Sequence, residues 1–435
     1  MKIILGKRKE TDSNENTDLY LLLGLIAGLL FLRDWGQIPV NKYILLMLVG
    51  VPALLMPLRK TLYLMCFVMP LYVGLPGNYL TLIFLLKYFL VGKQVKLNGY
   101  NLLFCILAGG YVLLQSVATN HMAIAELVFF PSLVLVMFMY ACRIPYDKKQ
   151  ILLCYAAGVT ALGLIMLFST LRVYGFEDLL TSATRLGDDS MQFAEAGIMN
   201  VSIDPNFYGM FAIAAIATGC SALLQNQSDF TKLEKIMLAA MIASCAAVGL
   251  LGLSRGFLLI LLIWAVFFTF SSNNIKTFAT ILLLGLLAVA AVFVFMPSVI
   301  ESLLERFTED NISTGGGRLT LIEKYTALWG ASLGTILFGV GLWDCNVHCM
   351  PLQPLFGGGI LLFVSMLGFV LTLSRKPHSA IRIGSFVQRW LPLGSTVLMS
   401  MTVPAFNLLN FMYPVIFGGL YMKQEKTLCD LLEES

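Results

Sequence analysis

The sequence predicts an all-α, polytopic integral membrane protein with about 12–14 transmembrane helices. Three observations lead to this fold class: the composition, the succession of apolar stretches and the positions of the basic residues. Hydrophobic residues make up 58% of the 435 residues and charged residues only 12%, and the mean hydropathy is +0.83. A soluble domain of this size cannot bury so much apolar surface, so we expect a lipid bilayer to surround most of the chain.

Apolar stretches follow one another along most of the chain. Each is close to the roughly 17–25 residues that cross the hydrocarbon as a helix, or somewhat shorter. The sequence does not decide whether the shortest ones, near 61–92 and 390–422, cross fully. The expected spans are 19–33, 41–57, 61–76, 79–92, 99–118, 122–141, 150–171, 206–224, 236–253, 256–271, 277–296, 354–373, 390–405 and 407–422.

The basic residues predict the orientation. Lys2, Lys7, Arg8 and Lys9 precede the first apolar stretch, and no small-residue cleavage site follows it, so we expect a cytoplasmic tail and a retained first span. This orientation places most other basic loop residues on the cytoplasmic side, as the positive-inside rule requires. Those residues are Arg59, Lys60, Lys93, Lys96, Arg143, Lys148, Lys149, Lys232, Lys235, Lys276, Arg375, Lys376, Arg382, Arg389, Lys423 and Lys426.

With a cytoplasmic N-terminus and spans that cross in alternating directions, the chain divides into membrane-spanning, cytoplasmic and extracytoplasmic parts. Two large segments and one hairpin tip, Ser254–Gly256, are then extracytoplasmic, and every motif considered below falls in these places or at their borders. The expected parts are a cytoplasmic tail (1–18), transmembrane helices (19–171), an extracytoplasmic loop (172–205), central helices (206–296), a large extracytoplasmic loop (297–353), C-terminal helices (354–422) and a cytoplasmic tail (423–435).

Arg255 interrupts a stretch from Ile236 to Phe270 that contains no other charge. An arginine within hydrocarbon costs about 2.5–3.5 kcal/mol at the helix centre, so we expect Arg255 at a hairpin tip or in a wet cavity. Two interpretations are open. In the first, the side chain of Arg255 only extends to lipid headgroups. In the second, its guanidinium binds a phosphate group at the membrane surface.

The large extracytoplasmic loop contains a glycine run, Gly315–Gly317, followed by Arg318. Apolar residues then recur at helical spacing, which predicts an amphipathic helix over 319–329 on the outer membrane surface, with Leu319, Ile322, Tyr325 and Trp329 on its apolar face and Ser313 or Thr314 as its cap. The N-terminus of such a helix favours an anion through its free N–H groups and its dipole. The alternative is a flexible glycine linker before an anchoring helix.

His348 is one of three histidines and lies in the same loop as Arg318. A lone loop histidine often only forms hydrogen bonds, but this imidazole is also suited to accept a proton from a sugar hydroxyl. Cys345 and Cys349 flank it. A zinc site is disfavoured because its three ligands, Cys345, His348 and Cys349, would be crowded into five residues, and no second cluster of cysteines and histidines occurs in the other extracytoplasmic parts. The sequence does not decide whether Cys345 and Cys349 form a local disulfide.

Asp204-Pro205-Asn206 ends the first extracytoplasmic loop and enters the next span. Proline in a first turn beside a capping side chain predicts a helix start. A second role for Asp204 and Asn206, in binding a sugar or an arginine, is also considered.

Taken together, these motifs resemble the bacterial O-antigen polymerase and O-antigen ligase superfamily of polytopic, lipid-diphosphate-dependent glycosyltransferases. The resemblance covers roughly 185–373. It rests on the following motifs in order: Asp204-Pro-Asn206, Leu253-Ser-Arg-Gly256, Gly316-Gly-Arg318 with Trp329, Gly339-Val-Gly341, and His348 followed by a span with Gly359. Arg185 to Gly197 repeats the interval from Arg318 to Gly330. Cys349 departs from the family pattern, which usually has asparagine there.

The resemblance implies a glycan donor on undecaprenyl diphosphate at the outer face of the bacterial cytoplasmic membrane. It implies catalytic roles for His348, Arg255 and Arg318, and substrate binding by Arg185, Asp204, Asn206 and Gly317. The arginines would neutralise the diphosphate leaving group and His348 would orient or deprotonate the acceptor hydroxyl, with no metal or other cofactor. Membrane lipids, a flippase and a chain-length regulator are the implied partners, and no nucleic acid is.

Several functions remain open at this stage. A polymerase of O-antigen or capsule is favoured over a ligase because of the repeated arginine-glycine interval. A lipid-linked oligosaccharide transporter should carry charges or broken helices near the midplane, whereas the spans here contain few charges, Lys87 and Glu126 among them. A structural membrane protein would give Arg255 and His348 no role.

Overall fold

The computed structural model describes residues 16–72, 74–75, 77–90, 99–119, 129–141, 146–181, 186, 204–224, 230–252, 254–271, 301, 317–373, 383–402 and 409–422. Within these ranges the regular structure is α-helix without strands, which confirms the predicted all-α class. The helices are α2 (Thr17–Asp34), α3 (Lys42–Leu55), α4 (Leu58–Val68), α5 (Gly77–Leu90), α6 (Gly99–Ala118), α8 (Phe129–Ala141), α9 (Lys148–Thr181), α11 (Pro205–Leu224), α12 (Lys232–Leu251), α13 (Arg255–Ser271), α16 (Arg318–Trp329), α17 (Leu333–Phe338), α18 (Gln353–Leu373), α19 (Ile383–Ser400) and α20 (Leu409–Met422).

Five of the described helices, α6, α9, α11, α12 and α18, are long and apolar enough to cross a membrane. Shorter apolar helices occupy parts of α3, α5, α13, α19 and α20. The expected span 277–296 lies outside the described residues. Three boundaries differ clearly from the sequence prediction. Helix α4 ends at Val68, before the expected 76, and α19 begins at Ile383, before the expected 390. Helix α9 continues past residue 171 to Thr181, interrupted at Gly175, whose φ of 77° is not helical. Between residue 171 and Gly175 there is no proline or glycine to end the helix earlier.

Helix α11 forms the centre of the main core. It packs against α9, α12, α13, α19 and α20, and its residues from Tyr208 to Gly219 are all buried. A helix that is apolar on every side is typical of such a central position. Small residues bring its neighbours close: a Cβ on Gly209 would lie 2.7 Å from Met399, and one on Gly219 would lie 2.5 Å from Ile242.

The charged ends of several helices meet at one end of this bundle. Lys60 Nζ lies 2.7 Å from Asp18 Oδ1, and Lys149 Nζ lies 3.0 Å from Glu234 Oε1. These residues belong to the N-terminal turns of α2, α4, α9 and α12, which the positive-inside rule assigns to one side. At the other end, Arg172 of α9 donates a hydrogen bond to the Trp35 carbonyl after α2. The directions of α2, α4, α9 and α12 therefore agree with the predicted alternation of spans across the membrane.

Lys87 is a buried charge within α5, and its partners explain it. Its Nζ donates to the Leu54 carbonyl at 2.7 Å and to the Met56 carbonyl at 2.6 Å. Both carbonyls lie at the C-terminal end of α3, where helix carbonyls lack intrahelical partners. Lys87 thus caps a neighbouring helix.

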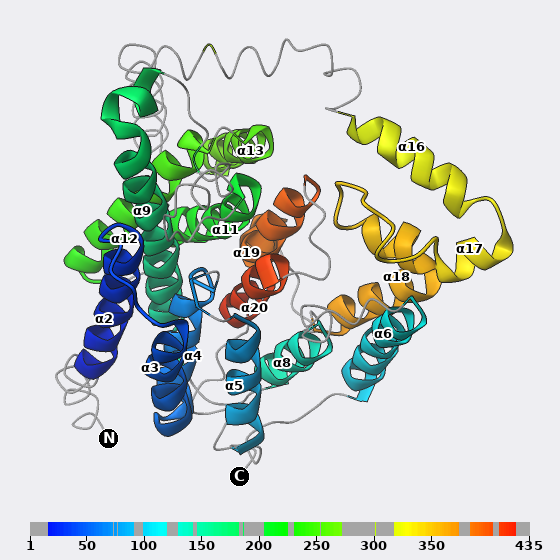
Figure 1. The fold of residues 1–435 in the computed structure, drawn as a ribbon, viewed down its shortest axis with the longest axis horizontal. Coiled ribbons are helices and arrows are strands. Elements are labelled where there is room, and N and C mark those ends of the chain that lie inside the picture. Colours follow the sequence, from blue (N-terminus) through cyan, green and yellow to red (C-terminus); the bar gives the residue numbers. More distant parts are fainter. Residues whose placement is uncertain are drawn as a thin grey trace.

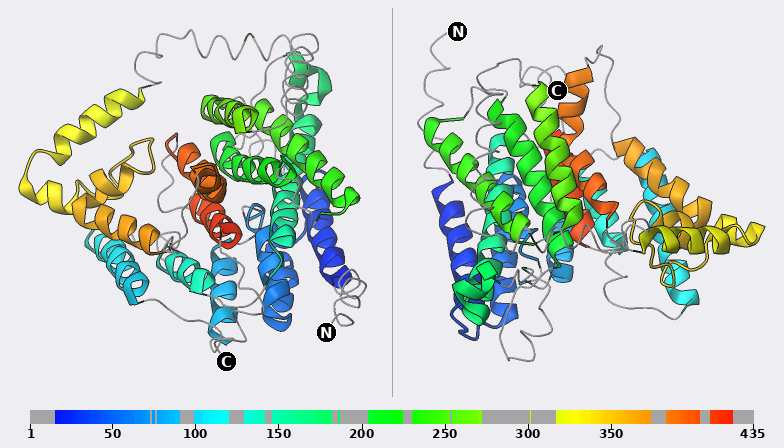
Figure 2. Two further views of the ribbon diagram at one scale, coloured as in Figure 1. Left: turned by 180° about the vertical axis from the view of Figure 1, so that it is seen from behind. Right: turned by 90° about the horizontal axis from the view of Figure 1, so that it is seen from above.

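Helices α6, α16, α17 and α18 lie together on one side of the molecule (Figures 1 and 2). Helix α6 packs along α18, and α8 contacts α6 on one side and α5 and α20 on the other. A further link joins the segment before α18 to α19, because the Met350 N–H donates to the Ser400 carbonyl at 3.0 Å. Of the candidate site residues, Arg318 and His348 belong to this side of the molecule, and Asp204, Asn206 and Arg255 belong to the main core around α11.

Candidate functional site

The tip between α12 and α13 is the predicted hairpin, and Ser254 organises it. Helix α12 ends at Leu251 and α13 begins at Arg255. The buried Ser254 Oγ accepts from the Phe257 N–H at 3.3 Å, as an N-cap does. A Cβ on Gly256 would lie 2.6 Å from Thr402 just after α19, so this turn is held against α19. Arg255 therefore projects from a fixed helix start.

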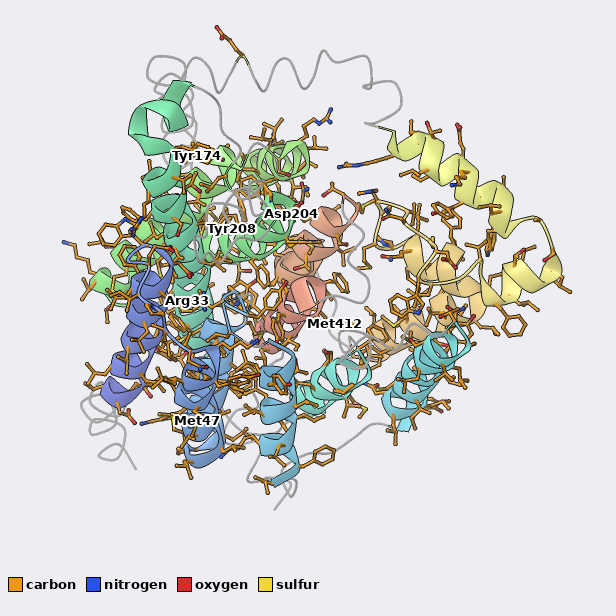
Figure 3. The ribbon with its side chains drawn as sticks, in the orientation of Figure 1. Arg33, Met47, Tyr174, Asp204, Tyr208 and Met412 are labelled. Atoms are coloured by element: carbon orange, nitrogen blue, oxygen red, sulfur yellow. The ribbon has the colours of Figure 1, made fainter. Side chains whose placement is uncertain are left out.

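Asp204 and Asn206 begin α11 as the sequence predicts. Asp204 Oδ1 accepts from the Asn206 N–H at 2.7 Å, while the Asp204 carbonyl accepts from the Tyr208 N–H at 3.0 Å. The Ser254 hydroxyl donates to Asn206 Oδ1 at 2.7 Å. This bond ties the start of α11 to the start of α13. Asp204 lies at the end of α11 next to α13 (Figure 3), and its side chain stays exposed.

Helix α16 confirms the predicted helix after the glycine run, but its cap is different. The N-cap is Gly317, with a left-handed φ of 79° and no side-chain cap, so the expected caps Ser313 and Thr314 are wrong. A residue with this φ is strained unless it is glycine. Arg318 is consequently the first helical residue, in the turn whose N–H groups lack intrahelical acceptors.

The apolar face of α16 also differs in part from the prediction. Tyr325 is buried, and Ile322 and Trp329 pack beside it, but Leu319 is 50% exposed and Leu321 takes its place. The contacts are made with the loop before α18 and with α18 itself, which the sequence pattern alone could not show. Together the buried residues form a second, smaller core. We call it the small core: Tyr325, Cys345, Val347, Cys349 and Phe356.

The loop that carries His348 lies on the small core with alternate residues inward. Cys345, Val347 and Cys349 are buried, whereas Asn346 is exposed and His348 half-exposed. Tyr325 fixes the middle of the loop: its hydroxyl donates to the Asp344 carbonyl at 2.7 Å and accepts from the Asn346 N–H at 3.0 Å. The two thiols that flank His348 in sequence thus lie in the small core, whereas His348 is partly exposed.

A close backbone contact between the segment before the loop and the start of α18 supports the His348 loop. The N–H groups of Val340 and Gly341 donate to the carbonyls of Phe356 and Gly357 at 2.9 and 3.1 Å. Gly359 interrupts α18 with a φ of 72°, and a Cβ there would lie 2.3 Å from the Leu337 carbonyl oxygen. Only glycine fits so close a backbone approach.

The electrostatics bring four predicted residues together. Burial lowers the pKa of the Arg318 guanidinium, and the positive charge of Arg255 lowers it further. Burial also lowers the pKa of the His348 imidazole; Arg318 adds to this effect, and the negative charge of Asp204 opposes it. These effects link the four residues in a series, Arg255 with Arg318, Arg318 with His348, and His348 with Asp204.

The two cysteines beside His348 are free thiols. Burial raises the pKa of Cys345 to about 11 and also raises that of Cys349, so both are protonated at neutral pH. In the part of the chain that the structure describes, no group of three His, Cys, Asp or Glu residues is arranged to hold a metal ion.

The site therefore gathers most of the residues that the sequence singles out. Charge effects link Arg318, at the start of α16, to Arg255 at the start of α13 and to His348 in the loop before α18. Asp204 acts on His348, Asn206 is bound to Ser254 next to Arg255, and Gly317 precedes Arg318. Arg185 lies outside the described residues. Its neighbour Leu186 donates its N–H to the Leu251 carbonyl at the end of α12, at 3.2 Å.

Sequence reasoning missed the residues that hold the site in place. Ser254 and Tyr325 lie within the motifs, but nothing in the pattern shows which partners they bind. Ser400 and Thr402 come from a distant span and contact the site through the backbone of Met350 and through Gly256. Such contacts join segments far apart in sequence, so spacing cannot reveal them.

Neither a family model, nor a curated protein, nor a solved structure matches this chain. The fold itself defines the class: the apolar helices are those of a multi-pass, all-α membrane protein. The arrangement of two arginines and a histidine at one end of the bundle adds the chemistry from which a function is argued.

Proposed function

We propose that this protein is a metal-independent glycosyltransferase that polymerises a surface polysaccharide such as O-antigen or capsule. It transfers a growing glycan from undecaprenyl diphosphate to a hydroxyl of another lipid-linked repeat unit, at the outer face of the bacterial cytoplasmic membrane. One observation carries the proposal: Arg318 lies within range of the charges of both Arg255 and His348, and these three residues come from separate segments.

The two arginines supply the binding of a diphosphate. Like charges held near each other repel, and this repulsion contributes to the lowered pKa of Arg318. An anion between them removes that cost, and a guanidinium binds phosphate oxygens through two parallel N–H donors. Arg318 also begins α16, so N–H groups of a first helical turn lie beside it. As the glycosidic C–O bond breaks, the charge that develops on the leaving diphosphate is stabilised here.

His348 then has the role of a general base. Its lowered pKa keeps the imidazole neutral near pH 7, which is the form that accepts a proton. The acceptor hydroxyl gives its proton to His348 while its oxygen forms the new bond to the anomeric carbon, and undecaprenyl diphosphate leaves. Asp204 stabilises the imidazolium that results, because its charge raises the pKa of His348.

The test is reconstitution of the purified protein in liposomes with a lipid-linked repeat unit as the only glycan. Wild type is expected to produce a ladder of longer lipid-linked glycans, with one undecaprenyl diphosphate released per bond formed. Arg255→Lys, Arg318→Lys and His348→Gln should each lose elongation by roughly 10²-fold or more, because a lysine cannot form the paired hydrogen bonds and glutamine cannot accept the proton. Glu323→Gln, exposed on the same helix as Arg318, is the matched control.

Three outcomes decide against the proposal. Elongation by all three variants at the wild-type rate would remove the assigned site. Loss of activity with a chelator, restored by a divalent cation, would contradict metal independence. In a second set of liposomes that also contain a lipid A core, transfer to that core, with no ladder when it is left out, would make the protein a ligase. Movement of intact repeats across the liposome membrane without transfer would make it a transporter.

A further inference from the structure

Gln115, a polar residue of the apolar helix α6, binds the segment next to the candidate site. Gln115 lies one turn before the end of α6 (Gly99–Ala118), a helix long and apolar enough to span the membrane. Its amide makes hydrogen bonds to the segment that joins α17 to the His348 loop. Because an unpaired amide is costly in an apolar environment, a glutamine here needs such partners.

The contacts of Gln115 use both ends of its amide. Nε2 donates to the Phe338 carbonyl at 3.0 Å, and Oε1 accepts from the Leu342 N–H at 3.0 Å. Tyr111, one turn earlier on α6, donates its hydroxyl to the same Phe338 carbonyl at 2.5 Å and accepts from Gln115 Nε2 at 2.9 Å. One side chain thereby joins the last carbonyl of α17 to the first N–H of the loop that carries His348.

These bonds satisfy groups that the local fold leaves without partners. Phe338 ends α17, and Gly339 follows with a left-handed φ of 80°, so the Phe338 carbonyl has no next helical turn to bond. Leu342 is buried, so water does not replace the acceptor for its N–H. The other attachments of the loop are Tyr325 in its middle and Ser400 at its end.

We infer that Gln115 is a positioning residue of the site: with Tyr111 it fixes the start of the loop 342–352 on α6 and so holds His348 in place. Gln115 touches neither His348 nor the arginines in any contact that the structure gives. It acts through the loop, and its role in catalysis rests on the function proposed above, whereas its role in holding the loop does not.

The test combines two measurements on Gln115→Met in native membranes and in liposomes. Methionine keeps the length of the side chain and loses the hydrogen bonds to Phe338, Leu342 and Tyr111. The first is the rate at which a membrane-impermeant maleimide labels Cys345 and Cys349, which are 1% and 7% exposed, followed on the peptide that contains them. We expect labelling to rise at least tenfold, since a released loop exposes the thiols. The second is elongation, where kcat should fall at least tenfold with KM for the donor changed less than twofold, because the arginines remain.

Two further variants make the result decisive. Tyr111→Phe removes the two hydrogen bonds of the Tyr111 hydroxyl but leaves the direct bonds of Gln115 to Phe338 and Leu342. It should give a smaller change of the same kind, and it decides the matter if Gln115→Met does not reach the membrane. Leu114→Met, which is 71% exposed on the same helix, should behave as wild type. Wild-type labelling in both Gln115→Met and Tyr111→Phe would overturn the inference. Faster labelling without elongation in any protein, wild type included, would leave the positioning role intact and remove the proposed function instead.

Discussion

At the scale of single residues, the pKa of His348 depends on its burial and on two charged neighbours that the chain brings from different segments. Burial and Arg318 lower its pKa from the usual 6.5, and Asp204 opposes them. In the proposed mechanism the neutral imidazole is the base, so protonation would stop the reaction. Activity is therefore expected to persist as the pH falls through 6.5 and to be lost only below it, at the lowered pKa of His348.

Asp204→Asn gives a signed prediction for this pKa. Asparagine keeps the oxygen that accepts from the Asn206 N–H but removes the negative charge that raises the pKa of His348. The acid limb of the pH dependence of kcat/KM should therefore move to lower pH, while the alkaline side is unchanged. The pH dependence of elongation in liposomes measures this, with Glu323→Gln as control. A limb that moves to higher pH, or stays in place, would show that Asp204 does not act on the catalytic group.

At the scale of structural elements, the glycines between α17 and α18 decide where the His348 loop lies. The interruption of α18 at Gly359 lets the N–H groups of Val340 and Gly341 reach its first turn. The backbones approach so closely that a side chain at Gly339 or Gly359 would overlap a carbonyl. The helix after the loop is thus bent to hold the segment before it.

Gly359→Ala is expected to disrupt this arrangement. The left-handed φ costs about 1–2 kcal/mol for a residue other than glycine, and the overlap with the Leu337 carbonyl adds about 1–3 kcal/mol. The melting temperature in detergent and the amount of protein in the membrane should both fall. Gly110→Ala is the matched control, because a Cβ there meets no atom within 4 Å and alanine favours a helix by about 1 kcal/mol. Equal stability of the two variants would contradict the close packing.

At the scale of the whole molecule, different charged residues lie at the two ends of the bundle. The pairs Asp18–Lys60 and Lys149–Glu234 join helix starts at one end, and Asp204 and Arg255 begin helices at the other. The positive-inside rule assigns the first end to the cytoplasm. By that assignment the site would face the outside, where the proposed function needs a lipid-linked glycan.

Single-cysteine labelling of intact cells checks this topology. In a background without native cysteines, Glu323→Cys and Asp204→Cys should react with a membrane-impermeant maleimide added outside, because both side chains are exposed at the end assigned to the exterior. Asp18→Cys, exposed at the opposite end, should react only after the cells are opened. The reverse pattern would place the site in the cytoplasm and exclude a donor presented at the outer face.

The sequence alone was sufficient for the all-α membrane class, most helix positions, the tip at Arg255, the start of α11 and the helix after Gly317. Those features depend on local composition, capping and periodicity, which act within a few residues. Only the tertiary structure decided the cap of α16, the burial of Leu321 in place of Leu319, the inward turn of Cys345 and Cys349, and the roles of Ser254 and Gln115. Each of these depends on atoms from segments far apart in the chain, whose packing and hydrogen bonds leave no periodic trace in the sequence.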